Sequence, residues 1–307
     1  MSSLQRFKIS ANNPPGIIFI TAALFVTFLW STSFIIIKRG LSEIPPLTYA
    51  GLRYSIAFVC LLPFVFTKSK LKEIKSINGK DWIKLIALGF LFYTFTQGTQ
   101  FFGLSLLPAV TVSLLLNFTP IVVAMMGIFF LSEKPSPLQW FGASLFIIGI
   151  LTYFYPIDFY GGKATGIIVM IFGVLANSGS AILGRSVNRG SKYSAITITV
   201  ISMGIGSSVM LASGIIFQGL PSISTTTFFY LLWLSIVNTA FAFTLWNFSL
   251  RHLTAMESSI INGTMLIQIA LLAWIFLGES ISILEGVGMF IAASGAVLVQ
   301  LRRKKVP

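Results

Sequence analysis

Polar side chains inside long apolar segments are the residues of this sequence that could do chemistry. The clearest is Arg53, which stands in the run YAGLRYSIAF from Tyr49 to Phe58. A full positive charge in such a run is expensive, so it faces a cavity or a partner. An arginine can hold a carboxylate through two hydrogen bonds, snorkel to the surface, pair with Glu43 or cap helix carbonyls. We therefore expect Arg53 to have a structural or gating role or to bind a carboxylate.

Other polar and aromatic residues accompany Arg53 in these segments. Gln97 and Gln100 are three residues apart and share a helix face, where they line a cavity or join two helices. Asn117 lies near Pro120, so its amide either bonds carbonyls freed by the proline or touches a ligand. The expected substrate-binding residues are Trp30, Ser33, Arg53, Tyr93, Gln97, Gln100, Asn117, Asn177, Asn238, Trp246 and Asn262.

Two kinds of residue in these segments have a structural alternative. Trp30 and Trp246 are either contacts to a ligand or anchors at a membrane interface. Glu257 lies about 5 Å inside the edge of its segment, at a rise of about 1.5 Å per residue. A partly buried carboxylate can carry a proton, which makes Glu257 the candidate for proton coupling. Its alternative is a pair with Arg251 or His252.

The composition indicates whether the chain folds in water or in a lipid bilayer. Of its 307 residues, 55% are hydrophobic and 9% are charged, whereas a soluble domain has about 25% charged residues. Apolar runs of about 20 residues are long enough to cross a bilayer. We expect an all-α integral membrane protein with ten transmembrane helices at 16–37, 47–67, 83–104, 108–131, 137–155, 164–184, 194–217, 227–249, 254–277 and 283–301.

The positive charge is distributed unevenly between the two sides of these spans. Seventeen of the 21 Lys and Arg residues lie in segments on the side of the N-terminus, and three lie in the opposite loops. Cytoplasmic loops carry the excess of positive charge. We expect both termini to be cytoplasmic, in the plasma or inner membrane. The net charge of +13 is therefore an orientation signal, and nucleic acid is not an expected partner.

The two halves of the chain repeat each other. At a constant offset of 146, Ala109 matches Ala255, Glu133 matches Glu279, and the pair Gly142 and Gly149 matches Gly288 and Gly295. Each half holds five expected spans, and two copies with an odd number of spans enter the membrane from opposite sides. Inverted repeats of this kind are typical of secondary transporters, with a substrate site between the halves. The expected parts are a cytoplasmic segment at 1–15, repeats at 16–155 and 164–301, a loop at 156–163 and a basic tail at 302–307.

Both ends of the repeat resemble a known family. The stretch LWSTSF at 29–34, the prolines before the second span and Arg53 within it resemble the start of an EamA domain. The stretches LSEKPSPLQWFGASLFIIGI and LGESISILEGVGMFIAASGA resemble its end. The resemblance implies the drug/metabolite transporter superfamily, with an inverted five-plus-five repeat, a central cavity, and export or exchange of small metabolites or drugs. Upstream of the long loop in the first half the offset between the repeats is 150, and there the second half departs from the pattern, because Met203 matches Arg53 and Ser180 matches Trp30.

These observations predict a secondary-active or facilitative transporter. It would export or exchange a small organic metabolite, amino-acid-like, or a drug, by alternating access. The alternative is a regulatory or scaffold membrane protein that keeps the fold without transport. The sequence holds no Walker A motif, and its spans hold no cluster of metal ligands or pair of carboxylates, so we expect no enzyme, no cofactor and no bound metal. The expected partners are a small-molecule substrate and the lipid bilayer, and the expected state is a monomer or homodimer.

Overall fold

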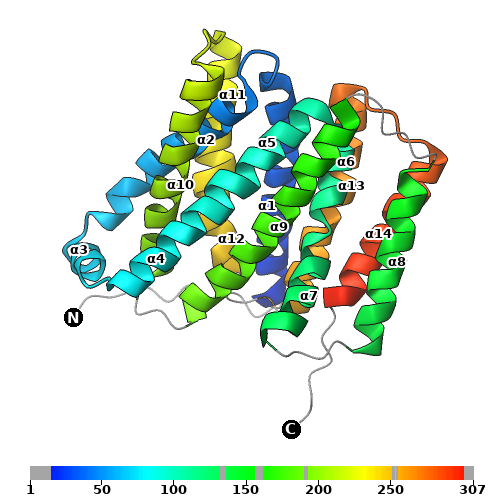
Figure 1. Cartoon of the computed structure of the whole chain (residues 1–307), viewed down its shortest axis with the longest axis horizontal. Coiled ribbons are helices and arrows are strands. Elements are labelled where there is room, and N and C mark those ends of the chain that lie inside the picture. Colours follow the sequence, from blue (N-terminus) through cyan, green and yellow to red (C-terminus); the bar gives the residue numbers. More distant parts are fainter. Residues whose placement is uncertain are drawn as a thin grey trace.

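The computed structural model describes residues 15–131, 136–155, 162–189, 193–250, 253 and 255–300, and within these ranges the chain is helical with no strand. The first half begins with a long helix and continues with a series of shorter ones (Figure 1). They are α1 (Pro15–Gly40), α2 (Pro46–Leu61), η1 (Leu62–Val65), α3 (Lys68–Lys75), α4 (Gly79–Leu88), η2 (Gly89–Thr96), α5 (Gln97–Leu106), α6 (Ala109–Leu116), α7 (Thr119–Leu131) and α8 (Pro137–Tyr153).

The second half continues with a similar series of helices. They are α9 (Gly162–Arg189), α10 (Ala195–Gln218), α11 (Thr225–Ser235), η3 (Ile236–Phe241), α12 (Ala242–Leu250), α13 (Ala255–Leu277) and α14 (Ile283–Gln300). Hydroxyl side chains fix the start of several helices by accepting a backbone N–H of the first turn. Ser136, Ser194 and Ser224 do this for α8, α10 and α11.

Length and composition fit these helices to a bilayer. Among the described residues, six helical segments are long and apolar enough to cross a membrane: Ile17–Gly40, Pro46–Val65, Ala109–Met126, Gly162–Gly184, Ala195–Gln218 and Thr225–Trp246. Three shorter apolar helices occupy Pro137–Tyr153, Ile261–Leu277 and Ile283–Val299. Large apolar side chains such as Phe217 and Phe290 are 80% and 72% exposed, which suits a surface in contact with lipid rather than water.

Small residues hold two pairs of helices together, and each pair joins the two halves. Helices α8 and α14 lie side by side at one edge of the molecule (Figure 1). A Cβ at Gly142 would lie 2.8 Å from the backbone nitrogen of Val299, and one at Gly288 would lie 2.5 Å from that of Tyr153. Helices α2 and α10 pack in the same way, at Gly51. The small residues therefore let these membrane helices approach closely.

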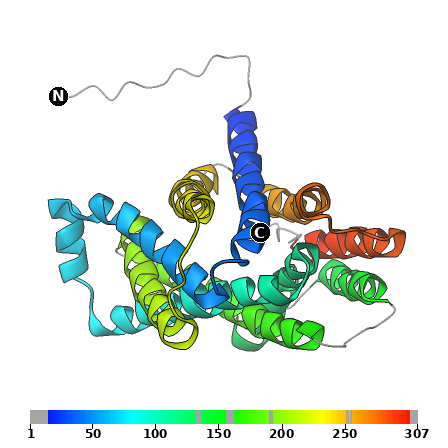
Figure 2. The same cartoon turned by 90° about the horizontal axis from the view of Figure 1, so that it is seen from above.

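The first helices of the two halves run in opposite directions. Helix α1 ends beside Leu107, whose carbonyl oxygen accepts a hydrogen bond from Lys38 Nζ. Helix α9 begins at that same place, because a Cβ on Gly166 would touch the Leu107 side chain. Seen from above, the helices surround the centre of the molecule rather than forming two separate bundles (Figure 2).

Three local features differ from a reading of the sequence as straight spans joined by loops. The basic stretch after the second span contains helix α3, which Thr67 caps. The third expected span is continuous from α4 to α5 but contains the π-helical turn η2, and the eighth contains η3. The fourth expected span is interrupted between α6 and α7, just before Pro120. Proline removes a backbone donor, which explains an interruption at this point.

Candidate functional site

A cavity of about 390 Å³ lies between the two halves of the chain. Its wall comes from α1, α2, η2, α5, α6 and α7 of the first half and from α9, α12, α13 and α14 of the second. Eight of the eleven residues expected to bind substrate line it: Trp30, Ser33, Arg53, Gln97, Gln100, Asn117, Asn177 and Asn262. Arg53 is seven residues from the start of α2 and Asn262 seven from the start of α13, so each lies about 10 Å from its own end of the bundle.

Arg53 is the positive charge of this cavity. The residue is only 4% exposed, and its Nε donates to Thr239 Oγ1 at 3.0 Å. Thr239 in turn donates to the carbonyl oxygen of Leu234, five residues earlier, which is the spacing of the π-helical turn η3. The guanidinium carbon lies 5.2 Å from the Tyr54 ring and 5.9 Å from the Phe101 ring. Aromatic faces and a hydroxyl therefore hold the guanidinium in place.

Pairing with Glu43, one alternative considered for Arg53, does not occur. The Glu43 carboxylate instead accepts the backbone N–H of Ser224 at 2.7 Å and the Ser224 hydroxyl at 2.8 Å. The Ser224 backbone N–H lowers the pKa of Glu43 from its ordinary value of 4.5. Among the described residues, Arg53 forms no ion pair.

The glutamines from the third expected span stand beside Arg53. The Tyr54 hydroxyl donates to Gln97 Oε1 at 2.6 Å, which fixes the orientation of that amide. Gln97 is the first residue of α5, directly after the π-helical turn η2, and Gln100 follows one turn later on the same face. Both line the cavity, so the shared face expected from their spacing points to it.

The asparagines of the cavity wall hold the interrupted fourth span. Asn117 Nδ2 donates to the Ser113 carbonyl oxygen at 2.9 Å, so its side chain bonds a helix carbonyl and also lines the cavity. Asn177 Nδ2 donates to Thr119 Oγ1 at 3.1 Å and thereby joins α9 to α7. Both alternatives considered for Asn117, a carbonyl partner and a place at the cavity, are thus compatible with its position.

Three of the expected residues lie behind the cavity wall. Asn238 is fully buried, and its Nδ2 donates to the Leu29 carbonyl at 2.7 Å and to Ser33 Oγ at 2.8 Å. Tyr93 is 4% exposed and packs edge to face on Tyr54, with ring centroids 5.6 Å apart. Trp246 packs against Trp30, with ring centroids 5.2 Å apart. These side chains support residues of the wall rather than forming it.

The sequence analysis did not single out several residues of the wall. Phe92 and Phe243 face the cavity together with Trp30, and the Trp30 and Phe243 ring centroids are 5.3 Å apart. Thr96 and Thr119 add hydroxyl groups. Helix α14 also contributes, through Ala293, Ala296 and Val297. Glu257 belongs to α13, but its side chain lies outside the described part of the structure.

Polar contacts join neighbouring segments at one end of the bundle, and most of them connect the two halves. The Glu279 carboxylate accepts the backbone N–H groups of Ala109 and Val110 at the start of α6, at 2.8 and 3.3 Å. Gln218 Oε1 accepts the N–H of Leu47 at the start of α2, at 2.8 Å. Lys38 and Arg39 donate to carbonyl oxygens near the ends of α5 and α13, those of Leu107 and Phe276. We call these contacts the latch, because each of them joins residues from different helices at the end where α1 finishes.

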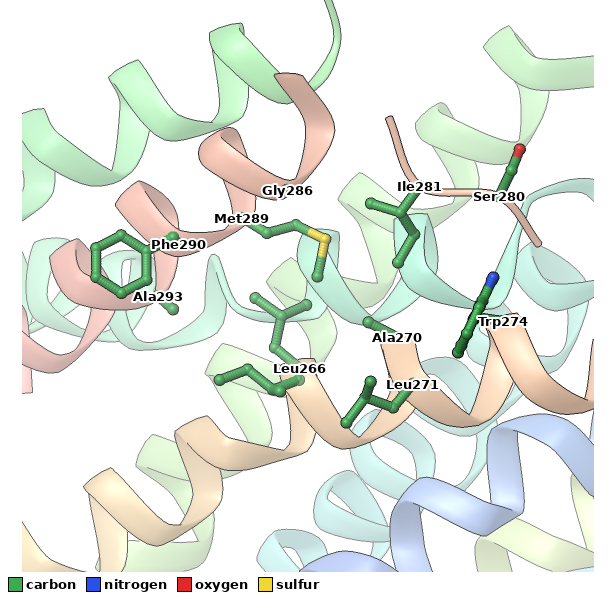
Figure 3. A pocket seen from close by; sticks show the side chains of 11 residues that line it. Leu266, Ala270, Leu271, Trp274, Ser280, Ile281, Gly286, Met289, Phe290 and Ala293 are labelled. Atoms are coloured by element: carbon green, nitrogen blue, oxygen red, sulfur yellow. The ribbon is translucent and has the colours of Figure 1, made fainter. Parts of the chain in front are cut away.

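A second hollow has a comparable size but a different chemistry. A groove of about 480 Å³ lies between α13 and α14, and its lining is almost wholly apolar (Figure 3). Leu266, Leu271, Met289 and Phe290 belong to this lining, and Trp274 stands at one end. Trp274 and Phe290 are 62% and 72% exposed, so the groove opens on the outer surface of the bundle. Such a surface contacts lipid tails in a membrane protein.

The fold and the cavity define a class before any comparison with other proteins. Apolar helices of membrane-spanning length surround a polar cavity between two halves of one chain, which is an arrangement typical of transporters. The profile of the EamA-like transporter family matches residues 16–155 and again 164–301. The chain belongs to this family and is a multi-pass membrane protein.

Curated relatives agree with this assignment. An uncharacterized transporter of Archaeoglobus fulgidus is 24% identical over 280 residues, covering 90% of this chain and 94% of the relative. The uncharacterized transporter YoaV of Bacillus subtilis is 27% identical, covering 84% and 88%. A probable amino-acid metabolite efflux pump of Escherichia coli is 25% identical, covering 73% and 75%. A solved crystal structure shares the fold, with a TM-score of 0.66 at 15% identity over 92% of this chain and 97% of that one.

Proposed function

We propose that the protein is a secondary-active or facilitative transporter that exports or exchanges a small organic metabolite, amino-acid-like, or a drug. The observation that carries this proposal is the cavity between the halves, where a buried arginine without an ion-pair partner among the described residues meets amides and aromatic rings. A charge in such a place is retained for function rather than for folding. The name of the Escherichia coli relative, an amino-acid metabolite efflux pump, supports the substrate range.

The transport mechanism in this proposal is alternating access by an inverted repeat of ten spans. Several of the largest helix contacts support it, because they have counterparts in the other half. Helix α1 packs on α12 and α13 of the other half, and α9 packs on their counterparts α5 to α7. Helices α2 and α10 are counterparts that pack on each other, and so are α8 and α14. The opposite directions of α1 and α9 add to this support.

The proposed orientation places both termini in the cytoplasm, as the distribution of Lys and Arg predicts. The latch would then close the cavity toward the outside, and the solute would enter from the cytoplasm. A reporter enzyme that is active only outside the cytoplasm, fused after residue 307, is expected to give no signal. The same reporter placed in the loop after α13 is expected to be active, and the reverse pattern would overturn the orientation.

Opening toward the outside requires the latch to break. Glu279→Gln removes the carboxylate charge that faces the N-terminus of α6 while keeping the shape of the side chain. An anion at a helix N-terminus contributes about 0.3–1 kcal/mol, so the outward-open population is expected to rise by roughly two- to fivefold. External labelling of Ser113→Cys, a cavity residue, in a protein without Cys60 measures this population; an unchanged labelling rate would show that Glu279 is not part of a gate.

Flux into and out of sealed vesicles tests the proposed function itself. Purified protein in proteoliposomes is expected to exchange labelled members of a panel of amino acids and their metabolites faster than empty liposomes do. Imposed pH gradients would show whether the flux is coupled to protons. Protein that binds a member of the panel without any flux would favour the alternative of a regulatory membrane protein.

A further inference from the structure

The side chain of Arg53 is only partly used by the protein. Its Nε donates to Thr239, whereas Nη1 and Nη2 have no hydrogen-bond partner among the residues that the structure describes. The side chain lines the cavity, so these two nitrogens are the donors left for a bound molecule. They form the planar fork that matches a carboxylate through two parallel hydrogen bonds.

Among the residues that the structure describes, the cavity wall contains no opposite charge, because none of the described residues that line it is Asp or Glu. A carboxylate placed on Arg53 therefore neutralises the site, whereas an ammonium group in the same cavity finds no carboxylate partner among these residues. Since an unpaired charge is unfavourable away from water, the wall favours a molecule with one negative charge over a zwitterion or a cation.

The remaining surface of the cavity wall has an apolar side and a side with free hydrogen-bond acceptors. Trp30, Phe92 and Phe243 form a continuous aromatic face, with centroid distances of 5.3 Å from Trp30 to Phe243 and 6.4 Å from Phe92 to Phe243. Asn117 and Asn177 each use their amide nitrogen within the protein. Their amide oxygens have no partner among the described residues, so they are available to a neutral donor such as an amide N–H or a hydroxyl.

We propose that the substrate class is an organic monoanion: a carboxylate on an apolar body that carries a neutral hydrogen-bond donor in place of a free ammonium group. N-acylated amino acids and hydroxy acids have this chemistry. The carboxylate binds Nη1 and Nη2 of Arg53, the body lies on the aromatic face, and the neutral donor meets Asn117 or Asn177. This inference rests on the proposed function and names the substrate class of the same cavity.

Matched probes that differ in charge alone test this inference. N-acetylphenylalanine is an anion, phenylalanine a zwitterion and phenylalaninamide a cation, and the same triplet can be made with tryptophan and with leucine. The shift in unfolding temperature of the detergent-purified protein reports binding, because a ligand of the native state raises apparent stability. Inorganic phosphate serves as an anion without an apolar body.

We expect the N-acetyl compounds to raise the unfolding temperature and to bind at least tenfold more tightly than the zwitterion or the cation with the same body. Arg53→Lys keeps the charge but loses the fork, so it is expected to bind the N-acetyl compounds at least tenfold more weakly. Arg53→Met is expected to abolish the shift. Lys80→Met, which removes an exposed charge on α4 far from the cavity wall, is the control and is expected to behave as the unchanged protein.

Four outcomes would overturn the inference. They are preference for a zwitterion or a cation, equal protection by phosphate alone, an N-acetyl shift that survives Arg53→Met, and no shift with any of the three bodies. Each of these leaves the proposed function to be decided by the flux measurement. If instead the vesicles show no flux while the N-acetyl compounds bind through Arg53, the substrate site stands and the transport proposal fails.

Discussion

The central cavity and the groove between α13 and α14 are similar in size, about 390 and 480 Å³, and both touch Ala293. They differ in the side chains that reach them. The cavity receives an arginine, a tyrosine and five amide side chains from both halves, whereas the groove receives leucine, methionine and aromatic side chains from one corner of the second half. The two hollows therefore differ in the chemistry of their walls rather than in volume, and the cavity offers more polar groups to a bound molecule.

Removing the charge from the cavity should give the largest effect. Arg53→Met is expected to lower the rate of exchange about 100-fold, because truncating one partner of a buried charged contact costs about 2–5 kcal/mol. Trp274→Ala in the groove is expected to change that rate less than about twofold. Exchange in proteoliposomes, normalised to folded protein, measures both variants. Normal exchange by Arg53→Met would mean that the charge is not needed by the solute.

A smaller loss of exchange rate is expected when Arg53 is kept but the hydroxyl group that holds its side chain is removed. Thr239→Val deletes the hydroxyl that accepts from Arg53 Nε at 3.0 Å. A hydrogen bond to a charged group contributes about 1.5–3 kcal/mol, so exchange is expected to fall about tenfold or more. Thr244→Val is the control, since this exposed threonine donates to the carbonyl oxygen of Ala240, four residues earlier in the chain, and has no side-chain bond to Arg53. Equal rates in the two variants would show that Thr239 does not position the arginine.

Substitutions at two glycines distinguish the tight contact between α8 and α14 from the open groove beside it. A Cβ on Gly149 would lie 2.7 Å from the carbonyl oxygen of Gly288, whereas one on Gly286, which lines the groove, would meet nothing within 4 Å. Gly149→Ala is therefore expected to destabilise the protein by about 1–3 kcal/mol, as overpacking does. Gly286→Ala is expected to leave the unfolding temperature unchanged or slightly higher. Equal unfolding temperatures for the two variants would mean that α8 and α14 make room for the added methyl group without any loss of stability.

The smallest effect concerns a charge at the end of the bundle rather than in the cavity. The hydrogen bond from Ser224 lowers the pKa of Glu43 below 4.5 in the folded protein. The stability from this contact is therefore complete above about pH 4.5 and is lost as the pH falls through the lowered pKa. Unfolding temperatures from pH 6 to pH 3 are expected to fall less in Glu43→Gln than in the unchanged protein. If the unfolding temperatures of the two proteins fall equally with pH, the contact between Glu43 and Ser224 contributes nothing to stability.

The sequence predicted the positions of the helices well, because the apolar runs of membrane length became one helix or a continuous series of helices, except for the fourth, which is interrupted between α6 and α7. It did not predict the turns η2 and η3 or helix α3. A π-helical turn has no sequence signal, since it depends on which carbonyls the packed neighbours leave free. Thr239 reaches Arg53 only through such a turn, and no spacing rule places residues 53 and 239 together.

The polar members of the cavity were easier to predict than its aromatic members. Amides and charges are rare in the apolar runs, so Gln97, Asn117 and Arg53 stood out in the sequence. Phe92 and Phe243 did not, because the chain has 29 phenylalanines and most face lipid or the core. Hydroxyl groups such as that of Thr96 also gave no signal, since threonine in a helix bonds its own backbone at little cost.

Alkylation of a cysteine in the cavity tests most directly whether this cavity is the path of the solute. Asn117→Cys, in a protein whose Cys60 is replaced by alanine, is exposed to a maleimide in proteoliposomes that are exchanging the solute with the highest flux. We expect that this solute slows the alkylation and that the alkylated protein no longer exchanges it. Fully alkylated protein that exchanges the solute at an unchanged rate would contradict it.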